Sequence, residues 1–265
     1  MGEWRTAICE TNAIRMRYTR TGAGKPALVL LHGLASNGLC WTAIARELED
    51  EYDLIMPDLR GHGESSTPEH GYRYADHAND VVGLINGLGV SAPVLFGHSM
   101  GGLLAAVVAS RQPSLIRGLV LADPTFISPE QQREVRDSDV ADQHRRLLNS
   151  SLEEVLQDLQ TRHPQRALTT LELLARARLE TSLSAFEVLT PPYPDYQPLV
   201  KSIDVPSLLV IADGGVVSSD LALELQRVNP KLQVVQIKAA GHGLIYDQPG
   251  QFSAIVKTFL RSIDQ

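Results

Sequence analysis

The chain has 265 residues, enough for one sizeable hydrophobic core or two small domains. Its 43% hydrophobic and 21% charged residues are ordinary for a soluble globular protein and do not by themselves suggest a function. The formal net charge of −7 argues against nucleic acid or an anionic membrane surface as a partner.

Short apolar segments alternate with helical patterns along the first half of the chain. Ile14, Met16 and Tyr18 alternate with polar residues, which predicts a half-buried strand at the edge of a sheet. The other apolar runs predict strands at Ala27–Leu31, Asp53–Pro57, Val94–Phe96 and Leu119–Ala122. Helical spacing predicts helices at Trp41–Glu49, Asp76–Leu88 and directly after Ser99.

Strands and helices alternate again late in the chain, and this alternation predicts a doubly wound, mostly parallel α/β sheet. Strands are expected at Ser207–Ile211 and Leu232–Ile237, and helices at Asp220–Val228 and Phe252–Ile263. Residues 126–203, between the strands predicted at Leu119–Ala122 and Ser207–Ile211, show no convincing strand. Leucines at helical spacing over 147–159 and 171–179 predict helices there instead.

This helical insertion follows the strand that ends at Ala122, and it defines the expected domains. A core is expected at residues 1–125 and 204–265, and a helical cap at 126–203. Such a cap would lie over the carboxyl ends of the strands, where α/β sheets bind ligands. A peripheral stabilising bundle is the alternative.

The segment Gly97-His98-Ser99-Met100-Gly101 carries the main chemical signal. A G-x-S-x-G sequence between a buried strand and a helix predicts a sharp turn that lifts the serine hydroxyl clear of the sheet. We therefore take Ser99 as the candidate nucleophile.

A serine hydroxyl at neutral pH needs a base, and the base needs an orienting acid. His242 follows the last predicted strand, so its loop lies at the same edge of the sheet as Ser99, and it is the candidate base. Asp123 follows the strand after the nucleophile helix and is the favoured acid, with Asp213 as the alternate acid one strand later. Asp220 and Asp247 are weaker alternatives.

A tetrahedral intermediate carries an oxyanion, which two backbone N–H groups commonly stabilise. The expected donors are Met100, next to the nucleophile, and Leu34, in the loop after the strand Ala27–Leu31. His32 is expected to brace that loop rather than to transfer protons. Asp58 and Arg60, in the segment 58–65, are expected to form a buried structural pair.

No cofactor or metal is expected, because the eight histidines do not show the spacings of hydrolytic zinc sites. Cys9 and Cys40 fit no ligand or redox motif, so we interpret them as unpaired core residues in a reducing compartment. There is no signal-peptide pattern and no run of 18 apolar residues, so no membrane segment and a cytoplasmic location are expected. The sequence does not determine the oligomeric state.

Four motifs in this order resemble the α/β-hydrolase superfamily over nearly the whole chain. They are His32-Gly33, the segment 58–65, the turn around Ser99, and Gly241-His242. The resemblance implies an eight-stranded α/β-hydrolase sheet with the cap after the sixth strand. The usual acid loop is shortened at Asp213, whereas the segment 121–124 is similar to relatives that carry the acid after strand 6.

The resemblance is strongest to small bacterial esterases, including thermostable ones from environmental DNA that also open N-acyl homoserine lactones, the quorum-sensing signals. It implies a serine carboxylic-ester hydrolase that acts on a small ester or lactone through an acyl-enzyme. A cofactor-free C–C bond hydrolase, or a perhydrolase or haloperoxidase on the same fold, is the alternative. A non-enzymatic ligand receptor is a third, weaker hypothesis. Five residues are expected to line an apolar acyl channel, namely Phe126, Leu147, Phe186, Leu189 and Tyr193.

Overall fold

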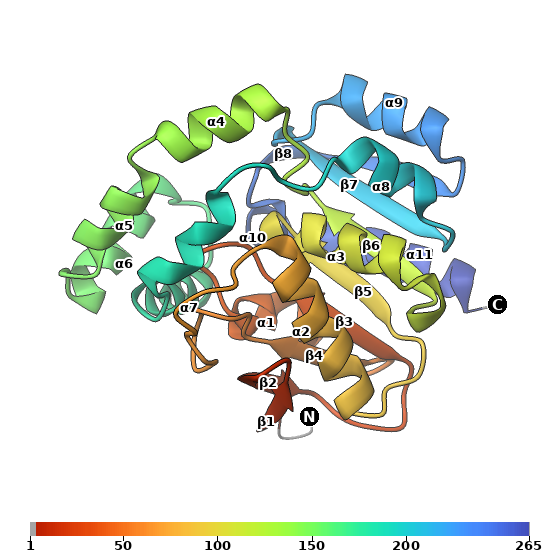
Figure 1. Cartoon of the computed structure of the whole chain (residues 1–265), viewed down its shortest axis with the longest axis horizontal. Helices are drawn as coiled ribbons and strands as arrows, with labels where there is room; N and C mark the ends of the chain where they lie inside the picture. Colours follow the sequence, from red (N-terminus) through yellow and green to blue (C-terminus); the bar gives the residue numbers. More distant parts are fainter. Residues whose placement is uncertain (1–3, 265) are drawn as a thin grey trace.

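Eight strands form a single sheet in the computed structural model, which describes residues 4–264 (Figure 1). The strands lie in the order β1-β2-β4-β3-β5-β6-β7-β8. β2 pairs antiparallel with β1 and β4, and the other neighbouring strands are parallel. The expected eight-stranded, mostly parallel sheet is therefore confirmed. The strands are β1 (Arg5–Thr11), β2 (Ile14–Arg20), β3 (Ala27–Leu31), β4 (Asp53–Pro57), β5 (Val94–His98), β6 (Gly118–Ala122), β7 (Ser207–Gly214) and β8 (Leu232–Gly241).

Helices cover both faces of the sheet, which is why the central strands are apolar throughout. All five residues of β3 are buried. Val29 and Leu31 pack into one core cluster, while Leu28 and Leu30 pack into the other, because successive side chains point to opposite faces. The first face carries α2 (Tyr74–Gly87), α3 (Met100–Arg111), α8 (Tyr196–Ser202) and α9 (Ser219–Val228), and the second carries α1 (Thr42–Leu48), α10 (Leu244–Asp247) and α11 (Pro249–Ile263). Short 3-10 turns lie at η1 (Gly38–Trp41) and η2 (Pro113–Leu115).

One strand, β1, is not among the segments that the sequence analysis names individually. Its first four residues are exposed, and only Cys9 and Thr11 are buried. The strand therefore lacks the apolar alternation by which β2 is recognised, and its pairing with β2 decides its conformation.

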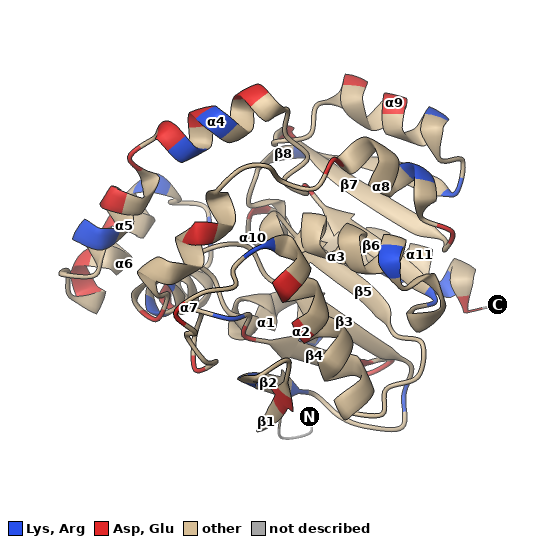
Figure 2. Cartoon of the chain, in the orientation of Figure 1, with Lys and Arg blue, Asp and Glu red and all other residues tan. Residues whose placement is uncertain are grey.

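The segment between β6 and β7 is helical, as its composition predicts. In Figure 1 the helices α4–α7 lie to one side of the sheet, and Figure 2 shows charges of both signs along α4 and α5. Residues of α6 and α7 form a small apolar cluster of their own with Cys40. The elements are α4 (Pro129–Asp137), α5 (Val140–Leu147), α6 (Leu152–Arg162), α7 (Leu168–Leu179) and η3 (Leu183–Leu189).

The last helix of this segment, α8, lies against the sheet rather than beside it. Helix α8 packs against α3 and α9 on one face of the sheet. Its Val200, and Ile203 after it, belong to the core cluster of that face. Val188 of η3 belongs to the same cluster, so the last part of the segment packs against this face of the sheet.

Glycines let α3 approach the sheet closely beneath the turn at Ser99. A Cβ on Gly101 would clash with the carbonyl oxygen of Leu31 in β3. A Cβ on Gly97 would clash with the backbone of Gly101. Both contacts involve backbone atoms, which cannot move aside without shifting β3, β5 or α3.

We expect Gly101→Ala to lower the free energy of unfolding by at least about 2 kcal/mol, because overpacking against backbone outweighs the gain in helix propensity. Gly250→Ala is the matched control, since a Cβ at this helical glycine meets no atom within 4 Å. Urea unfolding of both variants measures the difference. Equal stability of the two variants would show that α3 does not depend on this close approach.

Candidate active site

Ser99 occupies the turn between β5 and α3 in a conformation that side chains rarely adopt. Its backbone angles are φ 55° and ψ −120°. The carbonyl oxygen of Ser99 accepts hydrogen bonds from the N–H groups of Gly102 and Leu103, which fixes the turn. A non-glycine residue held at positive φ by its surroundings is typical of a functional site.

A chain of hydrogen bonds links Ser99 to His242 and Asp123. His242 Nε2 lies 2.8 Å from Ser99 Oγ, and His242 Nδ1 lies 2.6 Å from Asp123 Oδ2. The three residues follow β5, β8 and β6, whose carboxyl ends meet at one edge of the sheet. The structure therefore brings together the three residues that the sequence analysis favours.

The Asp123 carboxylate is fully buried and held by donors on both oxygens. Oδ2 also accepts a hydrogen bond from the N–H of Val216 at 2.8 Å, and Oδ1 accepts one from Val217 at 3.0 Å. A Cβ on Gly215 would lie 2.6 Å from Asp123 Oδ1, so only glycine allows the loop after β7 to approach the carboxylate this closely. The loop after β7 thus supplies donors to the acid instead of supplying the acid.

The alternate acid, Asp213, does not contact His242. Its exposed carboxylate accepts hydrogen bonds from Gln236 Nε2 at 2.8 Å and from the N–H of Ala239 at 3.0 Å. It therefore ties β7 to β8, outside the hydrogen-bond chain. Asp220 is exposed in the first turn of α9 and is not part of the chain either.

Asp247 supports the loop that carries His242. Its Oδ2 accepts a hydrogen bond from the N–H of Gly241 at 3.0 Å, and its Oδ1 accepts one from Arg166 Nε at 2.7 Å. Arg166 comes from the connection between α6 and α7, so the helical segment is linked to the loop beside the nucleophile. No sequence pattern indicates this contact, because the two residues are 81 positions apart.

His98 supports the same loop from the other side. Its Nε2–H donates to the carbonyl oxygen of His242 at 2.8 Å, and the side chain is buried. Burial and, to a lesser extent, the neighbouring His242 lower the pKa of His98 to about 4. His98 occupies a variable position of the G-x-S-x-G turn, so the motif itself does not indicate this role.

The backbone N–H groups of Leu34 and Met100 lie beside Ser99. Leu34 lines the same cavity as Ser99, and Met100 is the first residue of α3. A Cβ on Gly33 would lie 3.1 Å from Ser99 Cβ, so this loop runs against the nucleophile. Within residues 4–264, neither N–H donates a hydrogen bond to another protein group.

Two buried histidines hold the loop that contains Leu34. His32 donates from Nδ1 to the carbonyl of Gly33 and accepts at Nε2 from the N–H of Leu59. His62 accepts at Nε2 from the N–H of Ala35, at 3.3 Å. Both rings must be neutral to accept, and burial lowers the pKa of His32 to about 4 and that of His62 to about 3.

The expected pair between Asp58 and Arg60 is not formed, and this prediction is wrong. Asp58 pairs with Arg17 at 3.4 Å, whereas Arg60 pairs with Asp80 at 2.5 Å. Both partners are remote in the chain, on β2 and α2. Residue spacing within the motif could not reveal them.

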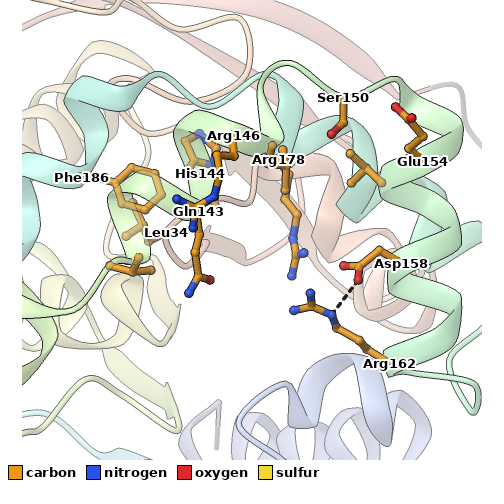
Figure 3. Close-up of a pocket in the computed structure, with 14 residues that line it drawn as sticks. Leu34, Gln143, His144, Arg146, Ser150, Glu154, Asp158, Arg162, Arg178 and Phe186 are labelled. Carbon is orange, nitrogen blue, oxygen red and sulfur yellow. Dashed lines mark hydrogen bonds and ion pairs between the residues drawn. The ribbon is translucent and has the colours of Figure 1, made fainter.

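Two adjoining cavities open at this edge of the sheet. The first, about 490 Å³, is lined by Ser99 and His242 and is called the serine cavity. The second, about 760 Å³, lies among α5, α6 and α7 and is called the helical cavity (Figure 3). They share three lining residues, namely Leu34, Ala35 and Arg178.

Of the five residues expected to line an apolar channel, two line a cavity and three lie in the hydrophobic core. Leu147 and Phe186 line the helical cavity. Phe126, Leu189 and Tyr193 line neither cavity, because they pack with the core on one face of the sheet. The expectation for these three is therefore not met. Polar and apolar residues line the helical cavity about equally, and the spacing of residues in the sequence does not predict the three arginines among them.

Among residues 4–264, no three or more His, Cys, Asp or Glu side chains are grouped so that they could hold a metal ion. Over the same residues, no helix combines the length and the apolar character that crossing a bilayer requires.

Residues 26–249 match the family model described as alpha/beta hydrolase fold. The chain is 36% identical, over 112 residues, to a 2-(acetamidomethylene)succinate hydrolase of Mesorhizobium japonicum. The aligned residues make up 42% of this chain and 40% of that protein. It is 27% identical, over 253 residues, to an N-formylmaleamate deformylase of Pseudomonas putida, with 94% of each chain covered.

A solved structure of a thermophilic esterase from Thermogutta terrifontis, with malate bound, is similar with a TM-score of 0.80 and 27% identity. The likeness covers 98% of this chain and 100% of that one. The chain aligns with only 31–40% of the length of the curated relatives to which it is 34–36% identical.

His62 should make the stability of the fold depend on pH. The folded chain keeps this ring neutral, whereas the unfolded chain takes up a proton below pH about 6.5, so acid stabilises the unfolded state. The contribution is complete above that pH, and about 2 kcal/mol of it is lost between pH 7 and pH 5.

We expect His62→Gln, whose amide oxygen can still accept from Ala35, to remove that part of the pH dependence. Urea unfolding at pH 7, 6 and 5 measures it. His70→Gln is the matched control, because the His70 side chain is 83% exposed. If the two variants lose stability equally between pH 7 and pH 5, His62 is not held neutral by the fold.

Proposed function

Because the chain belongs to the alpha/beta hydrolase fold family, we propose that it is a serine hydrolase that cleaves carboxylic esters, lactones included, through an acyl-enzyme. The observation that carries this proposal is the hydrogen-bond chain from Ser99 through His242 to Asp123. The carboxylate of Asp123 can only accept, so the ring proton of His242 resides on Nδ1. Nε2 is then free to accept the proton of the Ser99 hydroxyl.

In the proposed reaction, Ser99 Oγ attacks the carbonyl carbon while His242 Nε2 takes the hydroxyl proton. The tetrahedral intermediate collapses, and the alkoxide leaves with the proton from His242. Water then attacks the acyl-enzyme with His242 as base, which releases the acid and restores Ser99. In a lactone, the leaving alcohol stays attached to the acyl group, and the steps are otherwise the same.

The N–H groups of Leu34 and Met100 are the proposed donors to the oxyanion. They are unpaired beside Ser99, so they would not have to leave another partner when the charge develops. Donors that are fixed in advance stabilise the transition state without a reorganisation cost. His32 and His62 would act on this step only through the loop that they hold.

The helices α4–α7 and η3 are proposed to be the cap over the site. Support comes from the cavities, because residues of α5, α6 and α7 line the space that continues from Ser99. The link from Arg166 to Asp247 supports the same role.

An amide is the second candidate substrate, because the relatives from Mesorhizobium japonicum and Pseudomonas putida are named as a hydrolase of an acetamido compound and a deformylase of an N-formyl compound. The esterase from Thermogutta terrifontis supports the ester. Both reactions use the same nucleophile, base and oxyanion donors. The C–C hydrolase and the perhydrolase or haloperoxidase remain alternatives that a substrate panel with no added cofactor would separate. N-acyl homoserine lactones belong in that panel as the lactone substrate.

We expect Ser99→Ala to lower kcat for a p-nitrophenyl butyrate assay by about 10³-fold or more. The matched control is Ser110→Ala, on the same helix, whose hydroxyl contacts Ser202 away from both cavities. Retention of turnover by the purified Ser99 variant would remove this residue from the mechanism. The Ser110→Ala control must keep the turnover of the wild type for the loss in Ser99→Ala to be specific.

The two acid candidates give a second test. Asp123→Asn keeps the size of the side chain but favours the wrong ring tautomer of His242, so kcat should fall by about 10⁴-fold. Asp213→Asn should retain kcat within a few-fold, because its contacts lie on Gln236 and Ala239. The reverse pattern in steady-state ester hydrolysis would make Asp213 the acid.

A further inference from the structure

The guanidinium of Arg178 lies where the two cavities meet. Arg178 belongs to the last turn of α7, is half-buried, and lines both cavities. Figure 3 shows its side chain extending into the open centre of the helical cavity, beside Arg162. Within residues 4–264, no hydrogen bond and no ion pair is formed by its guanidinium. It is therefore a cation without a partner among these residues, and it lines the same cavity as the nucleophile.

The other arginines that line the cavities each have a carboxylate partner. Arg162 Nε pairs with Asp158 at 2.8 Å, and Arg146 pairs with Asp139 at 3.3 Å. A third, Arg166, pairs with Asp247 at 2.7 Å and supports the His242 loop. These arginines are occupied by the protein itself. Arg178 alone among the four is left available for a ligand.

The one further acidic residue that lines the helical cavity does not neutralise Arg178. Glu154 accepts hydrogen bonds from the N–H and the hydroxyl of Ser151, where it caps the start of α6. Burial lowers the pKa of Arg178, and the charge of Arg162 lowers it further. A half-buried cation that faces other cations is costly until an anion pairs with it.

We propose that the substrate carries a carboxylate at some distance from the bond that is cleaved, and that Arg178 binds this carboxylate. A guanidinium presents two parallel N–H donors to a carboxylate, which gives both strength and orientation. This inference rests on the proposed function and specifies its substrate class. It replaces the expected apolar acyl channel by a short site with a cationic end, which would receive the carboxylate of the substrate.

A single short substrate could contact both Ser99 and Arg178, because the two residues line one cavity. Ser99 and Arg178 line the same serine cavity of about 490 Å³. Leu34, which lines both cavities, provides apolar surface for a short carbon chain between the two ends. The carboxylate held at Arg178 would then fix the carbonyl over Ser99 before attack, as remote binding groups do in enzymes.

The test compares two esters of similar size, monoethyl succinate with a free carboxylate and ethyl pentanoate without one. Hydrolysis is followed by titration of the acid released at constant pH. The wild-type chain should have the higher kcat/KM with monoethyl succinate. Arg178→Met should raise KM for monoethyl succinate by about 10- to 100-fold and leave kcat/KM for ethyl pentanoate within about 3-fold.

Two further variants separate recognition from a change in the fold. Arg178→Lys keeps the charge but loses the paired donors, so its KM for monoethyl succinate should fall between those of the wild type and Arg178→Met. Arg176→Met lies on the same helix with an exposed side chain and lines neither cavity, so it should match the wild type with both esters. Equal losses with both esters in Arg178→Met, or a wild-type preference for ethyl pentanoate, would overturn the proposal.

A binding measurement tests the carboxylate site independently of ester hydrolysis. Calorimetric titration of succinate and glutarate into the Ser99→Ala chain should detect binding of at least one, and adding Arg178→Met should abolish it. If the wild type hydrolyses neither ester but a dicarboxylate binds through Arg178, the proposed ester hydrolysis fails while the carboxylate site stands. If neither dicarboxylate binds, the carboxylate site is wrong whatever the esterase activity.

Discussion

The hydrogen bond from His242 Nδ1 to Asp123 Oδ2, 2.6 Å long, is the constraint on which the candidate site depends. It fixes the tautomer of the ring and so leaves Nε2 able to accept from Ser99. The bond requires a buried carboxylate, and that carboxylate is kept in place by the N–H groups of Val216 and Val217. Three parallel strands and the loop after a fourth must therefore end at the same edge for one proton transfer to be possible.

The loop that carries His242 is held from two sides, and this joins the helical segment to the core. His98 donates to the carbonyl of His242, while Asp247 accepts from Gly241 and pairs with Arg166. Arg166 thus contributes to the shape of the site, whereas Arg178, which lines the same cavity, has no partner among residues 4–264. The same residue type has two different uses within one cavity, and the difference lies in whether a carboxylate of the chain is within reach.

Much of the fold could be predicted because the central strands are continuous apolar runs, and such runs occur where helices cover both faces of a sheet. β3 is the clearest case, with every residue buried. β1 could not be recognised, since only pairing with β2 specifies it. The membership of α8 in the core layer and the burial of Tyr193 were also hidden, because an amphipathic pattern shows that a face is buried but not against which element.

The sequence by itself determined the turn at Ser99, the edge at which His242 and both acid candidates lie, and the order of the strands along the chain. Local spacing and the alternation of strands and helices are sufficient for these. Only the tertiary structure decided between Asp123 and Asp213 and paired Asp58 with Arg17 and Arg60 with Asp80. It also left Arg178 without a partner in the part of the chain that the structure describes. The physical reason is that an ion pair or hydrogen bond depends on distances of a few ångströms between residues far apart in the chain, which no periodicity in the sequence encodes.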